Sequence, residues 1–499
     1  MGPAEPEVST SAGRIRGRID DGIAVFRGIP FAKPPVGDLR FAAPVPCEHW
    51  DGTREATAFG PPSPQASPAG PAGQDTHAGQ WLTLNVWTPD PQAQSLPVMV
   101  WIHGGAYLFG SGGDWDGSVF AAAGVVFVSI NYRLGVEGFA QIDGAPANRG
   151  LLDAVAALNW IQQNITRFGG DPASVTVFGE SAGAGVIASL LAMNSAKGLF
   201  QRAIAQSVPG TFFTPELARS VTAAVAQEAG IPATREALAS TDPMRLVAAQ
   251  MDVTARMTDH HDWGAVRVTD TPFSPVIDGE VLTRAPWRAL LSGAARDVAL
   301  LTGHTKDEYR LFIAAKGKLG KVTDAEADTV LDYFAPAAHG PAGYRKAYPD
   351  AGAGGLFEVA FSDWLFRMPT LHLAQAHAMS GGKTYLYELS AQAPGGPFGA
   401  CHALDLPMLF GDYGDRGDRS PKPLSLTGTE PPPAFVALGD LMRHEWLSFA
   451  ASGAPGWAAY GTGHRTTRVY NLQPDVRSYP EEGSMHLWER HMFDALDLA

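Results

Sequence analysis

A serine flanked by glycines is the residue in this sequence best suited to nucleophilic chemistry. The segment Gly179-Glu180-Ser181-Ala182-Gly183 follows a short apolar run at residues 175–178 and precedes small and apolar residues at 184–193. The first pattern predicts a strand and the second a helix. In a tight turn between them, side chains two positions before and after the serine would clash, so glycine is expected there. Such a strained turn presents the Ser181 hydroxyl to a base and a substrate.

A second glycine-rich segment suggests how negative charge on a reacting carbonyl would be stabilised. Trp101-Ile102-His103-Gly104-Gly105-Ala106 directly follows another apolar run. Glycines at the end of a strand let backbone N–H groups approach a ligand closely. We predict an oxyanion hole formed by the N–H groups of Gly105, Ala106 and Ala182, supported by the helix that begins after Ser181. The ring of His103 is expected to be structural.

A serine nucleophile needs a base, and the base needs a carboxylate to orient it. In hydrolases built on this turn, the chain order is serine, acid, histidine. A predicted strand at residues 298–301 leads to Asp307 and Glu308, and the residues alone do not separate these two from each other or from a solvated charge cluster. His402 follows a predicted strand and a glycine-rich loop, which suits a histidine that must reach the serine. His372 and His377 lie on a predicted helix and are weaker candidates.

Strands and helices alternate around these motifs. Apolar runs at residues 98–102 and 125–130 predict strands buried on both faces, and residues 151–168 repeat apolar side chains at helical spacing. The pattern predicts an α/β protein with the α/β-hydrolase fold: a large, mostly parallel sheet flanked by helices, in one domain over residues 1–499. A helical insertion at about 211–265 is expected to cap the site, although plain outer-layer helices would give the same pattern.

Composition narrows the possible partners and cofactors. The net charge of -14 argues against nucleic acids and anionic membrane surfaces as partners. No run is long and apolar enough to span a bilayer, and the first residues lack the basic and apolar regions of a signal peptide, so a cytoplasmic protein is expected. Two cysteines make no disulfide framework. His260 and His261 are adjacent and would face different ways on a helix, so we expect no metal site and no cofactor.

Several further motifs, in the same order along the chain, resemble those of the type-B carboxylesterase family, most closely its bacterial members. They are Phe26-Arg27-Gly28-Ile29-Pro30, Leu84-Asn85-Val86-Trp87, Asn131-Tyr132-Arg133-Leu134-Gly135, Phe168-Gly169-Gly170-Asp171-Pro172, the acid segment from Gly303 to Glu308, and Cys401-His402-Ala403-Leu404-Asp405-Leu406-Pro407. By this resemblance the acid is Glu308 and the base is His402. The resemblance also implies that Glu180 and Ser207 belong to a supporting polar network.

The sequence departs from the family's second motif, where Gly79 stands in place of a glutamate that pairs with the arginine at Arg40. We predict that Arg40 instead meets an acid of the preceding loop, such as Asp75, or backbone carbonyls, because a buried unpaired charge is costly. The cysteine of that motif is also missing, so the early disulfide of animal members cannot form. Residues 61–79 contain no Trp, Tyr or Phe, so the aromatic choline site of the cholinesterases has no counterpart and cholinesterase activity is not expected.

The resemblance implies a serine carboxylic ester hydrolase that acts through an acyl-enzyme on Ser181, takes small-molecule esters and works as a monomer or weak oligomer. An amidase, lactonase or thioesterase would use the same triad, because fold and triad do not fix the substrate. A non-catalytic binding protein is the alternative from another class. Such relatives typically lack part of the triad, whereas Ser181, Glu308 and His402 are all present here.

Overall fold

The computed structural model describes residues 5–66, 79–413, 426–428 and 430–499 and divides into two compact units. The first contains residues 1–203, 212–285 and 495–499, and the second contains residues 204–211 and 286–494. The boundary falls within strand β10 (Arg202–Gln206). The expectation of one domain over the whole chain stays a prediction.

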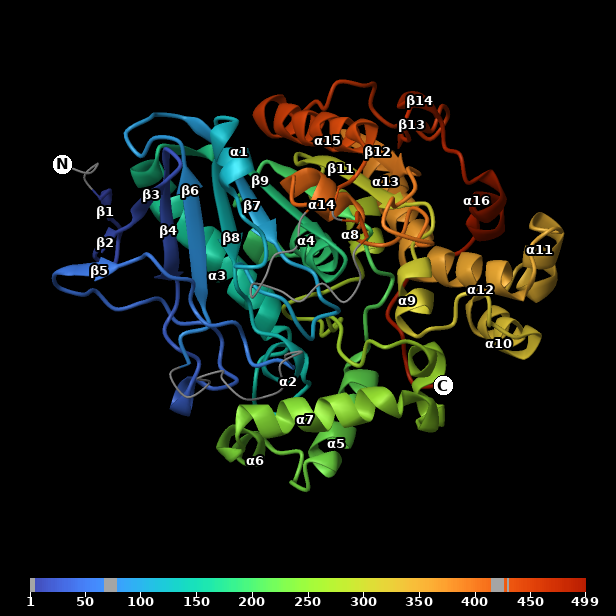
Figure 1. The fold of residues 1–499 in the computed structure, drawn as a ribbon. Coiled ribbons are helices and arrows are strands. Elements are labelled where there is room, and N and C mark those ends of the chain that lie inside the picture. The colour runs from blue at the N-terminus through green and yellow to red at the C-terminus, as the bar shows by residue number, and fades with distance from the viewer. Residues whose placement is uncertain (1–4, 67–78, 414–425, 429) are drawn as a thin grey trace. The chain divides into compact units, whose positions relative to one another are not determined.

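The first unit contains a mixed sheet in the order β9-β7-β8-β6-β4-β3 (Figure 1). Its strands are β3 (Arg18–Asp20), β4 (Ile23–Pro30), β6 (Thr83–Thr88), β7 (Leu96–Ile102), β8 (Val126–Ile130) and β9 (Gly170–Glu180). Strand β7 runs parallel to both β8 and β9, whereas β6, β4 and β3 are antiparallel to their neighbours. Strands β1 (Glu7–Ser9), β2 (Arg14–Arg16) and β5 (Thr53–Glu55) form a separate small sheet.

Helices pack on this sheet as the apolar spacing predicted. Helix α3 (Arg149–Asn164) buries Leu151, Leu158 and Ile161, and the predicted helix continues as a 3-10 turn to Phe168. Helix α4 (Ala182–Ala192) is almost entirely buried, which explains its run of small and apolar residues. The remaining helices before the insertion are α1 (Ser118–Ala122) and α2 (Gly135–Phe139).

The predicted helical insertion consists of α5 (Pro215–Glu228), α6 (Arg235–Ser240) and α7 (Pro243–Ala255), followed by 3-10 turns (Figure 1). Each helix begins at a side chain that accepts a hydrogen bond from the first turn: Thr214, Thr234 and Asp242. Gln250 of α7 fixes the insertion to α2, because its Oε1 accepts a hydrogen bond from the N–H of Val136 at 3.3 Å. Whether the insertion caps a site stays a prediction.

The second unit has parallel strands β11 (Ala299–Thr305), β12 (Thr384–Leu389) and β13 (Thr466–Tyr470), with β14 (Asp475–Ser478) antiparallel at the edge. Its helices are α8 (Pro286–Leu291), α9 (Arg310–Ala315), α10 (Asp324–Phe334), α11 (Gly340–Ala347), α12 (Ala353–Ser362), α13 (Met368–Met379), α14 (Asp405–Phe410), α15 (Pro433–Ser452) and α16 (Glu482–Trp488). The strands predicted at residues 298–301 and 384–389 are therefore confirmed. The acid candidates follow β11 directly.

Candidate active site

Ser181 occupies the turn between β9 and α4 with a backbone conformation that ordinary residues avoid (φ 57°, ψ −126°). The two flanking glycines are required by the neighbouring backbone. A Cβ on Gly179 would lie 2.4 Å from the carbonyl oxygen of Ile102, and one on Gly183 would lie 2.1 Å from the same oxygen. The predicted clash at both positions is thus confirmed. The turn leaves Ser181 half-buried while both glycines are buried.

The glycine-rich segment after β7 lies against this turn. A Cβ on Gly104 would be 2.8 Å from the carbonyl oxygen of Glu180 and 3.2 Å from the Ser181 Cβ. Gly105 and Ala106 both have positive φ, 108° and 53°. Since the first N–H groups of a helix have no acceptor within the helix, Ala182 adds a donor at the start of α4. The residues predicted as oxyanion donors therefore belong to two backbone segments that the structure brings together.

His103 stabilises this segment through its ring. Its Nδ1 lies 2.8 Å from the carbonyl oxygen of Gly104, and the ring stacks on Tyr132 with centroids 4.5 Å apart. Burial lowers the pKa of His103, which keeps the ring uncharged. The Tyr132 hydroxyl donates to the His103 carbonyl at 2.8 Å. The structural role predicted for His103 agrees with these contacts, whereas the contribution of Tyr132 was not predicted.

Arg40 shows how the first unit compensates for the missing glutamate. Its guanidinium binds the Glu137 carboxylate on α2 (Nη2 to Oε1, 2.5 Å), and it also donates to the carbonyls of Ala239 and Thr241. The predicted carbonyl partners are found, but the acid comes from α2 instead of the preceding loop. Asp75 and most of residues 61–79 lie outside the described residues. A side chain at Gly79 has no room, because its Cβ would lie 2.2 Å from Val36.

Glu308 and His402 meet in the second unit, both buried. His402 Nδ1 lies 2.5 Å from Glu308 Oε2, and the other carboxylate oxygen accepts from the Ser207 hydroxyl (2.6 Å) and the Thr305 N–H (2.8 Å). Burial alone would raise the pKa of Glu308, but the charge and hydrogen bond of His402 and the hydrogen bond of Ser207 outweigh it and lower that pKa. The carboxylate is therefore charged and oriented. His402 also stacks on Phe366, with ring centroids 4.2 Å apart.

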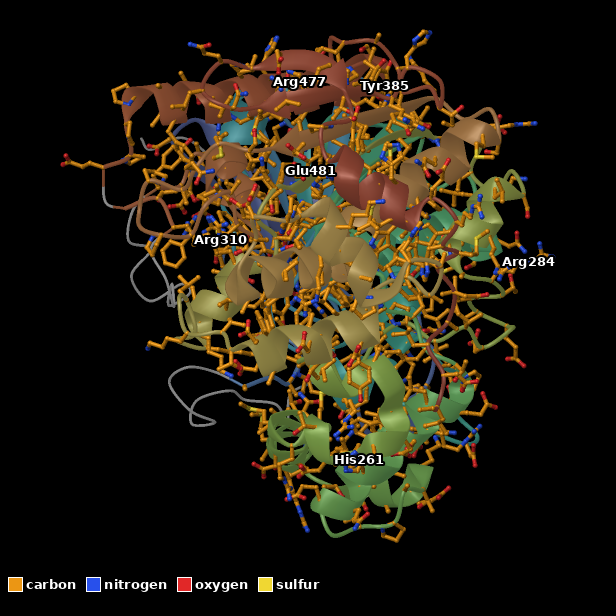
Figure 2. All side chains as sticks on the ribbon, turned by 90° about the vertical axis from the view of Figure 1, so that its right-hand side faces the viewer. His261, Arg284, Arg310, Tyr385, Arg477 and Glu481 are labelled. Atoms are coloured by element: carbon orange, nitrogen blue, oxygen red, sulfur yellow. The ribbon has the colours of Figure 1, made fainter. Side chains whose placement is uncertain are left out.

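Asp307 contacts the histidine loop and not the histidine ring. Its Oδ2 accepts from the Ala400 N–H at 2.9 Å, and its own N–H donates to the Ala400 carbonyl at 2.8 Å. Arg310, labelled in Figure 2, lies 3.3 Å from the same carboxylate and also binds Glu358. Because this pair fills the space beside Gly399, a Cβ there would lie 2.3 Å from Asp307 Oδ2. The structure thus distinguishes the two adjacent acids: Glu308 contacts the ring of His402, whereas Asp307 contacts the backbone of the loop. Residue types alone could not make this distinction.

The histidines that the sequence offered as weaker candidates for the base or as metal ligands do not contact Glu308 in the structure. His377 is buried against Thr384 and the Ala295 carbonyl, and His372 packs edge-on against Phe493. His261 is exposed (labelled in Figure 2), whereas His260 stacks on Trp263. Among the described residues no group of three or more His, Cys, Asp or Glu side chains is arranged to hold a metal ion. In the same residues no helix combines the length and apolarity needed to cross a bilayer.

A serine on a strained strand-to-helix turn, with a glycine-rich backbone segment from the neighbouring parallel strand against it, defines the class of α/β-hydrolases. Comparisons with known proteins place the chain within that class. A family profile described as "Carboxylesterase family" matches residues 4–488. The chain therefore belongs to the carboxylesterase family.

Curated relatives and solved structures agree with this assignment. Para-nitrobenzyl esterase of Bacillus subtilis (strain 168) is 35% identical over 95% of this chain and 96% of its own length. Liver carboxylesterase of Sus scrofa is 33% identical over 91% of this chain and 86% of its own. The crystal structure of a Geobacillus stearothermophilus carboxylesterase is similar with a TM-score of 0.84 and 35% identity, covering 97% of this chain and 99% of that one. The predicted fold class and an enzyme acting on carboxylic ester bonds are thereby confirmed.

Proposed function

We propose that this chain hydrolyses carboxylic esters with Ser181 as nucleophile, His402 as general base and Glu308 as the orienting acid. His402 takes the Ser181 proton as the serine oxygen attacks the ester carbonyl. The N–H groups of Gly105, Ala106 and Ala182 stabilise the oxyanion, the alcohol leaves, and water releases the acid from the acyl-enzyme. The observation that carries the proposal is the strained conformation of Ser181 beside Gly104, in a member of this family.

The charged form of Glu308 supports its assigned role. A buried carboxylate that accepts hydrogen bonds from Ser207 and Thr305 keeps one oxygen for His402 Nδ1, so the opposite ring nitrogen is left to act as base. The same carboxylate stabilises the imidazolium that forms during the reaction. Glu180, buried against Gly104, is proposed to support the oxyanion segment. The reaction requires no metal ion or cofactor.

The proposed substrate is a small-molecule ester, handled by a monomer or weak oligomer in the cytoplasm without nucleic acid or membrane partners. The test is labelling by a fluorophosphonate probe, which reacts with activated serines. The wild-type chain should be labelled at one site, and Ser181→Ala should not be labelled. Rates of cleavage of aryl esters, anilides, lactones and thioesters then show which of these acyl-transfer reactions the chain catalyses fastest. Labelling that persists in Ser181→Ala would refute the nucleophile, and faster cleavage of anilides than esters would refute the substrate class.

A further inference from the structure

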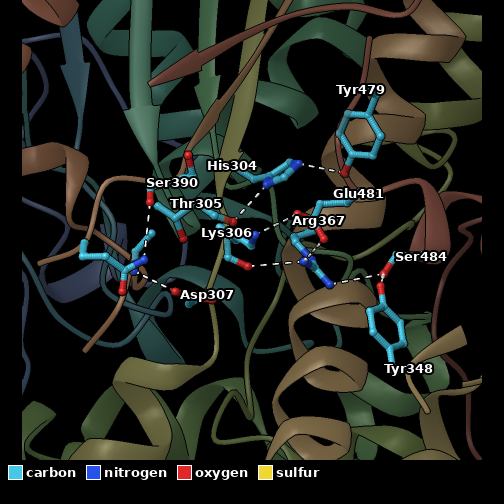
Figure 3. A network of polar contacts seen from close by, with 12 residues as sticks. His304, Thr305, Lys306, Asp307, Tyr348, Arg367, Ser390, Tyr479, Glu481 and Ser484 are labelled. Carbon is cyan, nitrogen blue, oxygen red and sulfur yellow. Dashed lines mark hydrogen bonds and ion pairs between the residues drawn. The ribbon is translucent and has the colours of Figure 1, made fainter. Parts of the chain in front are cut away.

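The second unit contains a buried histidine that the proposed mechanism does not use. It lies next to the loop that follows β11 and carries Glu308, called here the acid loop. His304, on β11, is fully buried, and both ring nitrogens have partners. Nδ1 lies 2.9 Å from the carbonyl oxygen of Thr305, and Nε2 lies 2.9 Å from the hydroxyl of Tyr479, as Figure 3 shows. Thr305 is the last residue of β11, and the loop that carries Glu308 follows it. The ring therefore connects the acid loop to the segment after β14.

The partners of its two ring nitrogens determine the tautomer of His304. A carbonyl oxygen only accepts, so Nδ1 carries the hydrogen and donates it to Thr305. Nε2 is then the acceptor, and the Tyr479 hydroxyl donates to it. Burial and the Arg367 charge lower the pKa of His304 to about 4, so the ring is neutral near neutral pH. Burial raises the pKa of Tyr479 well above its ordinary value, so its hydroxyl keeps its proton.

The Thr305 contact is one step from Glu308. The N–H of Thr305 donates to Glu308 Oε1, so both backbone polar groups of Thr305 serve the acid loop. The next carbonyl, that of Lys306, accepts from Arg367 at 3.3 Å. Arg367 in turn binds Glu481, close to Tyr479 in the chain. The consecutive carbonyls of Thr305 and Lys306 are thus bound by His304 and Arg367, and both of these side chains contact the segment at residues 479–481 (Figure 3).

We infer that His304 is a positioning residue: in its Nδ1–H tautomer, fixed by Tyr479, it holds the Thr305 carbonyl so that Glu308 meets His402 in the reactive geometry. This inference rests on the proposed function of Glu308 and His402. It goes beyond that function because it names the groups that set the acid's position. A small displacement of Glu308 would weaken its short contact with His402 and leave substrate binding unchanged.

The test compares two substitutions of similar size. In His304→Asn the side-chain amide places an N–H donor near the Nδ1 position, whereas His304→Leu has no donor. We expect His304→Leu to lower kcat about ten-fold with KM within two-fold, since a 1 Å misplacement can cost up to about a hundred-fold. His304→Asn should recover most of that loss. Tyr479→Phe keeps the shape of the ring but removes the hydroxyl that fixes His304, so it should give a smaller loss of kcat. It replaces His304→Leu as the test if that variant does not fold.

A second measurement separates positioning from general destabilisation. The proton between His402 Nδ1 and Glu308 should give a far-downfield proton NMR resonance, which we expect to shift upfield or broaden in His304→Leu and return in His304→Asn. Unchanged kcat and resonance in His304→Leu and Tyr479→Phe would overturn the inference, as would equal losses in the Leu and Asn variants. The Ser181→Ala labelling control reports on the proposed function separately, because its outcome does not depend on residue 304.

Discussion

The serine region of the first unit and the acid–histidine region of the second are held in place by different means. Around Ser181 the backbone itself is constrained, with positive φ at Gly105, Ala106 and Ser181 and no room for a Cβ at Gly183. Around Glu308 the backbone is also strained at Ser207 and Ala403 (φ 54° and 62°), but the carboxylate itself is held by hydrogen bonds to distant side chains and to the backbone. Backbone constraint selects glycine and leaves a local pattern in the sequence, whereas hydrogen bonds between distant residues leave none.

The largest loss of turnover should come from a substitution in the serine region, where the backbone is constrained. Ser181→Ala should leave the fold intact, because it removes one oxygen from a half-buried side chain. Turnover should fall roughly a millionfold, as in other serine hydrolases that lose the nucleophile. Hydrolysis of p-nitrophenyl acetate measures it, with circular dichroism as the folding control. Residual activity above a few per cent would contradict the assignment of Ser181.

The next largest effect distinguishes two adjacent carboxylates in the hydrogen-bonded region. Glu308→Gln should lower kcat on the order of 10⁴-fold, because His402 loses the charge that orients it and stabilises its cation. Asp307→Asn is the matched control and should cost much less, since Asp307 contacts the Ala400 N–H and Arg310 and not the ring. Equal or reversed effects would mean that the wrong carboxylate has been chosen.

The same contrast explains what the sequence could and could not predict. The turn at Gly179–Gly183 and the strand before it followed from local pattern alone, because a Cβ clash is a local constraint. Asp307 and Glu308 have the same charge and are neighbours in the chain, so only the family resemblance chose between them. Tyr132 and His304 lie within motifs that the sequence resemblance picked out, but their contacts could not be predicted, because their partners depend on folded geometry. Glu137 as the partner of Arg40 was missed for the same reason.

Backbone crowding at the serine turn predicts a stability effect. In Gly183→Ala the new Cβ would lie 2.1 Å from the Ile102 carbonyl oxygen, so the backbone must move. We expect a loss of about 3 kcal/mol in the free energy of unfolding, among the large effects of single substitutions. Gly354→Ala is the control, because nothing lies within 4 Å of its Cβ position on α12. That change should stabilise by up to about 1 kcal/mol. Similar values for the two variants in urea denaturation would contradict the crowding argument.

The smallest expected effect concerns a buried carboxyl of the second unit, Glu388, which pairs in register with His304. Two buried carboxylates of the first unit are paired with arginines: Asp153 with Arg133 at 2.8 Å and Glu137 with Arg40 at 2.5 Å. Glu388 is different: burial and the Glu481 charge raise its pKa to about 8, against the opposing charges of Arg367 and Lys306. The folded protein therefore keeps this proton at a pH where the unfolded chain has lost it.

The sign of the pH dependence follows from this proton. Between pH 4.5 and about 8 the unfolded chain binds fewer protons at Glu388, so stability falls as pH rises, by up to about 1.4 kcal/mol per pH unit. Glu388→Gln keeps the shape and cannot ionise. It should match the wild-type chain near pH 4.5 and exceed it by one to a few kcal/mol at pH 8. Urea denaturation at pH 5, 6.5 and 8 measures this, with exposed Glu489→Gln as the control. A constant difference across that range would show that Glu388 is charged in the folded protein, like the arginine-paired carboxylates Asp153 and Glu137.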